Sequence, residues 1–167
     1  MRTRCFVLFF LLILPFVNIR SQNPIRFDTI IAINSNDSAQ IRANIEIWMK
    51  RNGSGFLSDK STTSSNGQFY HRYGSSLRWG NHYGNISYNV LAEFKSDRLR
   101  ISSGGFTHKA ENSLMGISLD YGLVTDSEKP VSGLSKKYWE EIKKACKIRS
   151  FEVFKNISEA IDKSENW

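Results

Sequence analysis

Hydrophobic and polar residues alternate along the segment from Asn85 to Lys95. Its apolar positions are Ile86, Tyr88, Val90, Ala92 and Phe94, and the residues between them are polar except Leu91. A period of two is typical of a β-strand with one buried face. We therefore predict a half-buried strand here.

The alternation resumes from Arg98 to His108, after the short turn Ser96-Asp97. Two alternating segments joined by a tight turn predict an antiparallel hairpin. The pair Gly104-Gly105 inside the second segment indicates a β-bulge or a bend.

Three earlier segments are less regular. Ile25 to Ile33 is rich in β-branched residues and ends in a polar turn, which predicts a strand, and Gly67 to Tyr73 is a further strand candidate. The stretch Ser58 to Asn66 is polar throughout. We expect it to be a loop or a weak edge strand that contributes no core residue.

A helix is predicted after the first strand. Ile41, Ile45, Trp48 and Met49 share one face at helical spacing. Asn36 or Asp37 can cap the first turn, and Asn52-Gly53 supplies a stop. Trp48 and Ile45 should lie between this helix and the sheet.

The C-terminal region is also predicted to be helical, with Ser135 as its N-cap. The apolar face consists of Trp139, Ile142, Cys146, Val153 and Ile157. It is interrupted at Arg149-Ser150, so one long helix and two consecutive helices both fit. Before it, Ala110 to Gly133 is expected to form a long surface connection.

These elements predict an α+β fold. Alternating strands need one covered face, and the helices offer apolar stripes that can cover it. We expect an antiparallel sheet of about four or five strands, with the N-terminal and C-terminal helices packed on one face.

The order of elements resembles the exported bacterial family numbered 4468 among domains of unknown function. The likeness rests on the helix Ile41 to Met49 with its Trp48, on the strand-turn-strand phrase Glu93 to Ile101, and on the helical tail. An insertion at Ser75 to Gly84 departs from the family pattern. The resemblance implies a fold like one half of TATA-binding protein, and no chemistry, since fold does not carry function.

The N-terminus predicts export. Arg2 and Arg4 precede an apolar run from Cys5 to Val17, which is a signal-peptide pattern. This run is shorter than the roughly 20 residues of a membrane span. We therefore predict a signal peptide at residues 1–21, a single domain at residues 22–167, and a periplasmic or secreted protein without a transmembrane anchor.

Charge and cysteine content exclude several classes of function and of site. Loss of residues 1–21 would lower the net charge from +7 to +4, and the remaining Lys and Arg are dispersed. Because no basic stripe is present, no nucleic-acid partner is expected. Cys146 is the only cysteine after cleavage, so neither an intramolecular disulfide nor a Cys/His zinc set is expected. The position of Cys146 favours core packing over a nucleophile, and no cofactor is predicted.

The most unusual segment runs from Tyr70 to Gly84 and combines aromatic residues with arginine, histidine and glycine. Rigid aromatic and polar side chains are typical of recognition loops. We predict five ligand-binding residues here: Arg72, Arg78, Trp79, His82 and Tyr83. Trp79 or Tyr83 would stack on carbohydrate, and the two arginines would contact an anion. The alternative is a hairpin loop whose aromatic rings fold back onto the sheet.

The three histidines, His71, His82 and His108, have no metal-binding spacing. A zinc site would need about three converging ligands, which His71 and His108 would complete only with Asp97 or Glu93. Structural histidines are the favoured interpretation. No G-x-S-x-G nucleophile elbow is present either.

Three hypotheses on function follow. The leading one is an exported, non-enzymatic domain that binds a protein, glycan or component of the cell envelope. The alternative is a small exported hydrolase that uses His71, His82 or His108. The third is a structural envelope component without a ligand pocket.

Overall fold

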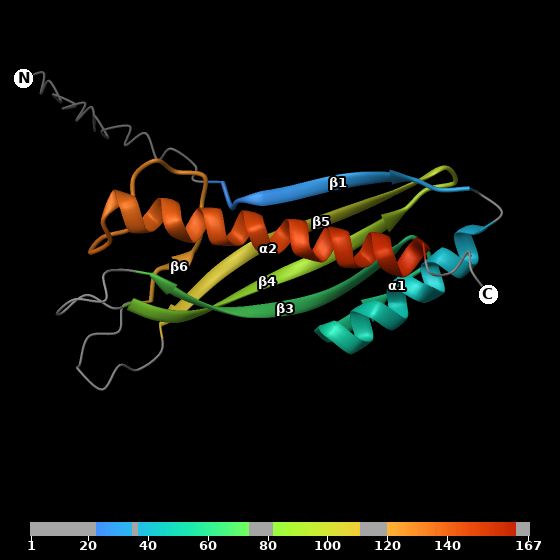
Figure 1. Cartoon of the computed structure of the whole chain (residues 1–167), viewed down its shortest axis with the longest axis horizontal. Helices are drawn as coiled ribbons and strands as arrows, with labels where there is room; N and C mark the ends of the chain where they lie inside the picture. Colours follow the sequence, from blue (N-terminus) through green and yellow to red (C-terminus); the bar gives the residue numbers. More distant parts are fainter. Residues whose placement is uncertain (1–22, 35–36, 74–81, 111–119, 163–167) are drawn as a thin grey trace, which may run out of the picture.

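The structure is a computed structural model, which describes residues 23–34, 37–73, 82–110 and 120–162. One antiparallel sheet and two helices make up this part of the chain (Figure 1). The elements in chain order are β1 (Arg26–Ala32), α1 (Ser38–Asn52), β2 (Ser54–Ser58), β3 (Thr62–Tyr73), β4 (His82–Phe94), β5 (Arg98–Ala110), β6 (Gly122–Leu123) and α2 (Lys136–Asp162). The predicted α+β class is confirmed.

The sheet has six strands, of which five follow the order β1-β5-β4-β3-β2, while the two-residue β6 also pairs with β5. The predicted hairpin of β4 and β5 forms its centre. Ser87 pairs with Thr107, but Asn89 pairs with Gly104, so β5 contains one extra residue. The predicted bulge is therefore present. Gly105 occupies it with a φ of 65°, a left-handed conformation that suits glycine.

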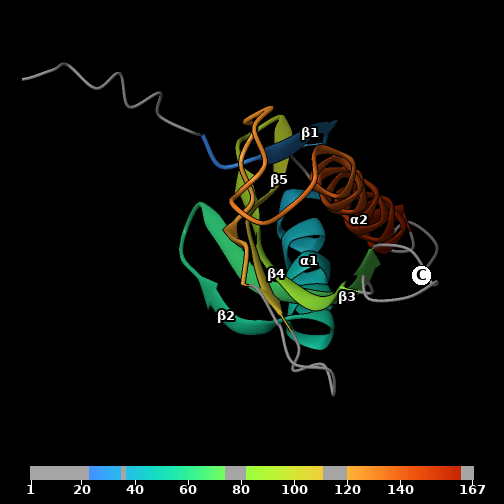
Figure 2. The same cartoon turned by 90° about the vertical axis from the view of Figure 1, so that its left-hand side faces the viewer.

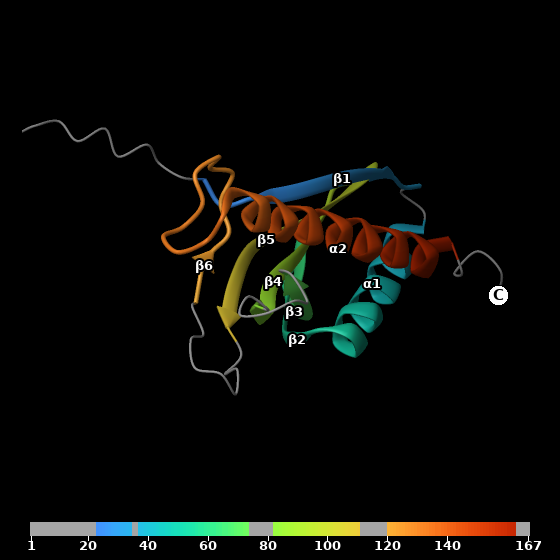
Figure 3. The ribbon, with the colours of Figure 1, turned by 60° about the vertical axis from the view of Figure 1, so that its left-hand side comes forward.

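Both helices pack on the same face of the sheet (Figure 2). Figure 3 shows α2 running along the sheet, with α1 beside its C-terminal half. α2 contacts β1, β3 and β5, whereas α1 contacts β2 and β3. Ile45, Ile142 and Cys146 are fully buried as predicted, and Trp48 is partly buried against the core.

The helix ends agree with the predicted caps in part. Asp37 stands at the N-cap of α1 without a side-chain capping bond, and the Gly53 N–H donates to the Met49 carbonyl at 3.0 Å. At the start of α2, the Tyr138 N–H donates to Ser135 Oγ at 3.3 Å. Asn36 lies outside the described residues.

α2 is one continuous helix of 27 residues, which decides between the two predicted alternatives. The two polar residues that interrupt its apolar face both have partners. Ser150 Oγ donates to the Cys146 carbonyl at 2.9 Å, and Arg149 Nε donates to the Tyr88 hydroxyl at 3.0 Å. Satisfied polar groups are tolerated in a core, so the helix need not break here. Neither helix in the described ranges is apolar enough over a sufficient length to cross a bilayer.

The expectation that Ser58 to Asn66 contributes nothing to the core is wrong. Most of this stretch belongs to β3, where Thr63 and Ser65 are buried. A Cβ atom added at Gly53 would lie 2.7 Å from Ser65 Oγ. The end of α1 thus approaches β3 so closely that only a small side chain fits, and the small residue that suggested a loop is a core residue.

The region between β5 and α2 is more than the surface connection that was predicted. Tyr121 and Val124 are buried, and the Val124 N–H donates to the Phe106 carbonyl at 2.8 Å. An isolated bridge also joins Pro24 to Thr125. The backbone of this segment therefore extends the sheet. Residues 111–119 of the predicted connection lie outside the described residues.

Candidate functional site

The sheet face opposite the helices is not covered by any element that the structure describes (Figure 2). We call it the open face. Its β3 and β4 side presents the exposed side chains of Asn66, Gln68, Tyr70, Ser87 and Asn89. Because residues of a strand alternate between faces, these positions are set by the same pattern that buries their neighbours.

The part of the open face formed by β1, β5 and the end of β4 carries four charged residues. Asp28 Oδ1 lies 2.9 Å from Arg26 Nε and 3.3 Å from an Arg100 guanidinium nitrogen, and both arginines lie 3.8 Å from Glu93 Oε2. Burial alone would raise the pKa of Asp28, but hydrogen bonds from Ser102, Arg26 and Arg100 hold it below its usual value. Two positive and two negative groups thus neutralise one another.

The central part of the β3 and β4 side is polar and uncharged, between Glu93 at one end and the exposed Arg72 at the other. Asn66 of β3 stands directly opposite Asn89 of β4, and Gln68 stands opposite Ser87. Tyr70 follows on β3 with 52% of its surface exposed. This side therefore offers hydrogen-bonding groups and an aromatic ring.

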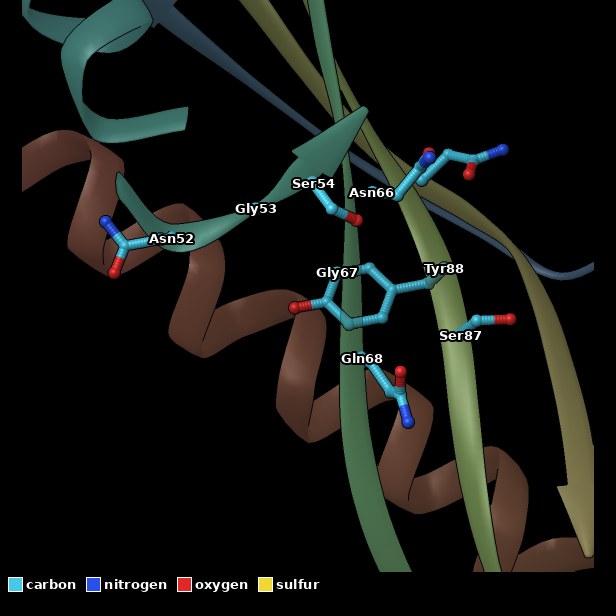
Figure 4. Close-up of a pocket in the computed structure, with 9 residues that line it drawn as sticks. Asn52, Gly53, Ser54, Asn66, Gly67, Gln68, Ser87 and Tyr88 are labelled. Atoms are coloured by element: carbon cyan, nitrogen blue, oxygen red, sulfur yellow. The ribbon is translucent and has the colours of Figure 1, made fainter. Parts of the chain in front are cut away.

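A cleft opens where the connection from α1 to β2 meets β3 and β4. It has a volume of about 570 Å³ and is lined by Asn52, Gly53, Ser54, Asn66, Gly67, Gln68, Ser87, Tyr88 and Asn89. Figure 4 shows the lining side chains and the ring of Tyr88 crossing β3 at Gly67. The volume falls within the range of small-molecule sites, about 300–1,000 Å³.

Glycines on the flanking strands leave room beside the two central amides. Gly55 has a φ of 60°, and a Cβ atom added there would lie 2.6 Å from the Asn66 amide nitrogen. The corresponding distance from Gly105 to the Asn89 amide nitrogen is 3.2 Å. Each amide nitrogen therefore lies close to glycine backbone, where a larger residue would collide with it. The positive φ of both positions also favours glycine.

Tyr88 anchors the floor of the cleft to α2. Its ring packs so closely on Gly67 that a Cβ atom there would collide with the ring. The ring also stacks on Phe106, with centroids 5.4 Å apart, and its hydroxyl accepts the hydrogen bond from Arg149. This arrangement fixes β3 relative to the long helix.

The five predicted ligand-binding residues are only partly placed. Arg72 is exposed on β3, and its backbone pairs with that of Tyr83, while His82 pairs with Tyr73. Arg78 and Trp79 lie outside the described residues.

The recognition loop predicted within Tyr70 to Gly84 is shorter than expected, because β3 continues to Tyr73 and β4 begins at His82. Gly84 does not mark a loop: a Cβ atom there would collide with the His108 imidazole. The glycine is explained by this close approach.

His71 and His108 lie at the same end of the helix-covered side. His108 is 1% exposed, and its Nδ1 accepts a hydrogen bond from the Tyr121 N–H at 3.4 Å. Burial lowers the pKa of His71, and the charge of Glu141 opposes that shift in part.

The convergence of these histidines with Asp97 or Glu93 is not observed. Asp97 lies in the β4–β5 turn, and Glu93 pairs with Thr62 and Arg100 next to it, at the opposite end of the hairpin from His108. Within the described ranges, no group of three histidine, cysteine or carboxylate side chains is placed to hold a metal ion.

Cys146 is fully buried, as predicted for a core residue. Burial raises the pKa of its thiol to about 12. The side chain is therefore a neutral thiol at physiological pH, and only a thiolate is an effective nucleophile.

Sequence reasoning did not single out the amides of the cleft. The signal was present as polar residues at alternate positions, 66 and 68 on one strand and 87 and 89 on the next. Their pairing across the strands depends on the register, which the sequence pattern alone does not provide.

The fold defines a class: an antiparallel sheet with both helices on one face, as in TATA-binding-protein-like domains. A DUF4468 family protein from Bacteroides ovatus ATCC 8483 has a TM-score of 0.57 to this chain at 17% identity, over 83% of this chain and 86% of that chain. A TBP-like protein from Parabacteroides distasonis ATCC 8503 has a TM-score of 0.65 at 11% identity, over 83% and 93%. No protein-family model and no curated protein matches the sequence. At these identities the likeness shows the fold alone, and it confirms the fold that the family resemblance implied.

Proposed function

We propose that this chain is an exported, non-enzymatic domain that binds a protein, glycan or other component of the cell envelope through the open face. The observation that carries the proposal is the cleft beside Asn66 and Asn89, whose lining combines uncharged hydrogen-bonding side chains of the open face with glycine backbone. A rigid sheet holds these groups in place, which favours recognition because little freedom is lost on binding.

The chemistry of the cleft supports binding rather than catalysis. Its side chains are amides, hydroxyls and one tyrosine, and the amides and serine hydroxyls do not ionise near neutral pH. General acid–base catalysis needs a group whose pKa lies near the operating pH. His108 and Cys146, which could supply such chemistry elsewhere, are buried.

Two further features support the proposal. The signal-peptide pattern of residues 1–21 favours export, and N-terminal sequencing of protein recovered outside the cytoplasm should find a start near Gln22. Arg72 is exposed near the end of β3, beyond Tyr70, and would extend the binding region there, while Arg78, Trp79, His82 and Tyr83 stay predicted contacts.

The proposal is tested by nuclear magnetic resonance with isotope-labelled protein and separate protein and polysaccharide fractions of the cell envelope. Binding at the open face should shift the side-chain NH₂ signals of Asn66, Gln68 and Asn89. Gln40 and Asn44, an exposed hydrogen-bonded amide pair on α1, are the internal controls. Shifts confined to the helices, or no shifts with any fraction, would contradict the proposal.

The hydrolase alternative rests on His71, His82 or His108. One observation favours it: burial lowers the pKa of His71, so this imidazole is neutral and able to accept a proton at pH 7. His71→Gln combined with His82→Gln should leave binding at the open face unchanged. Turnover of envelope polymers by the unmodified protein that disappears in this double variant would favour the hydrolase. Removal of His108 is less informative because that residue is buried.

A further inference from the structure

We infer that the cleft around Asn66 and Asn89 is a carbohydrate site that takes neutral, polyhydroxylated sugars. The inference rests on the proposed function, because it names the ligand class of the same face. It draws on four observations: the uncharged lining residues, the amides without partners among the described protein groups, the glycines against which two of these amides lie, and the adjacent tyrosine.

Charge argues first for a neutral ligand. None of the nine residues that line the cleft carries a formal charge. The neighbouring ionic groups on β1, β4 and β5 already compensate one another, because Arg26 and Arg100 both contact Asp28. The lining residues would give an anionic ligand no cation in exchange for its water, which is unfavourable, since the exposed Arg72 lies four residues beyond Gln68 on β3.

Hydrogen-bonding capacity points to hydroxyl groups. In the described part of the chain, the side-chain amides of Asn66, Gln68 and Asn89 form no hydrogen bond with protein groups. Each amide can donate and accept, and a sugar hydroxyl does the same. Paired residues on adjacent strands are about 5 Å apart and alternate residues about 7 Å apart, so the array matches hydroxyls on opposite sides of one sugar ring.

Shape completes the match. Gly55 and Gly105 let the amides of Asn66 and Asn89 lie close to the neighbouring strands, because a Cβ atom at either glycine would approach the amide nitrogen. Tyr70 lies two residues beyond Gln68 on the same face and exposes half of its surface. An aromatic ring offers an apolar face for the C–H side of a sugar while the amides bind its hydroxyls.

The test is calorimetric titration of the purified protein with neutral gluco-, manno-, galacto- and xylo-oligosaccharides. Oligogalacturonates of equal length are the anionic comparison. We expect saturable binding of at least one neutral series and at least tenfold weaker binding of the oligogalacturonates. Asn66→Ala combined with Asn89→Ala should weaken the neutral binding at least tenfold.

The matched control is Gln40→Ala combined with Asn44→Ala, which removes two amides from α1 and should leave the affinity unchanged. Thermal unfolding checks that each variant is folded. If the double asparagine variant does not fold, Gln68→Lys replaces it. A cation introduced at this exposed position should weaken neutral binding and strengthen oligogalacturonate binding.

Three results would overturn the inference: no binding of any neutral series at millimolar concentration, preference for the anionic series, or equal affinity of the folded asparagine variant and the unmodified protein. These results are distinguishable from failure of the proposed function. If the open face still responds to an envelope protein fraction, only the carbohydrate assignment is wrong. If it responds to no fraction, the binding function itself is wrong.

Discussion

The two faces of the sheet are formed by alternate residues of the same strands, yet they have opposite chemistry. On β4, Ile86, Val90 and Ala92 are buried under the helices, while Ser87 and Asn89 face outward. Packing explains the first set, because interiors are filled closely. The outward set has no packing role, which makes its repeated amides the better indicator of function.

The largest expected difference comes from removing an apolar side chain from each face. Ile101→Ala deletes a fully buried side chain and should lower the free energy of unfolding by about 2–5 kcal/mol. Ile30→Ala acts on a side chain of the open face that is 66% exposed, and should change the free energy of unfolding by less than about 0.5 kcal/mol. Urea unfolding measures both. Equal losses of unfolding free energy in the two variants would show that the two faces do not differ in packing.

Glycine substitutions test the same contrast between the two faces with smaller expected effects on stability. Gly67→Ala would bring a Cβ atom into the ring of Tyr88, and overpacking should cost about 1–3 kcal/mol. Gly104→Ala meets Arg26 at an ordinary 3.5 Å, so it should be neutral or stabilise the protein by up to about 1 kcal/mol. Thermal midpoints of the two variants provide the measurement. A stable Gly67→Ala variant would show that Tyr88 is not seated on β3.

Tyr88→Phe tests how the covered side holds β3 to α2. The substitution removes the acceptor of the Arg149 hydrogen bond and should cost about 0.5–1.5 kcal/mol. Arg149→Met breaks the same bond from the helix side. In a double-mutant cycle from urea unfolding, the two losses should be less than additive. Full additivity would mean that this bond contributes nothing.

The covered side should also respond to mild acid through His71. Because burial holds the pKa of this histidine below its ordinary value of 6.5, the unfolded chain binds the proton more tightly. Stability should therefore be complete above pH 6.5 and decrease as the pH falls through 6.5 toward the lower pKa of the folded state. Unfolding of the protein and of His71→Gln across this range checks the assignment, since the variant should lack this part of the decrease.

The open face should respond only to stronger acid, and weakly. The pKa of Asp28 lies below 3.8 in the folded protein, so its contribution is present above pH 3.8 and is lost as the pH falls through the folded value. Partly exposed ion pairs contribute less than about 1 kcal/mol. Asp28→Asn should flatten the stability profile below pH 4 and leave the region near pH 6 unchanged. A change in the stability of Asp28→Asn near pH 6 would contradict the assignment of the acid response below pH 4 to the open face.

Segments with strict alternation were predictable from sequence, and those with small polar residues were not. The β4–β5 hairpin and its bulge follow from alternation, the Ser96-Asp97 turn and the paired glycines. The buried position of Thr63 and Ser65 does not follow from their polarity. They are buried because α1 packs against this strand, with its end at Gly53 close to Ser65, and such an approach leaves no local pattern in the sequence.

The amino-acid sequence by itself determined the two helical regions, the first strand, the β4–β5 hairpin, the face that this hairpin buries and the signal-peptide pattern, because these depend on local patterns. Only the tertiary structure decided that Asn66 meets Asn89, that Gly84 makes room for His108, and that His71 and His108 lie far from Asp97 and Glu93. Cross-strand register and ring placement depend on contacts between residues distant in the chain. The candidate binding cleft is made of such contacts, so it became visible only once the sheet was assembled.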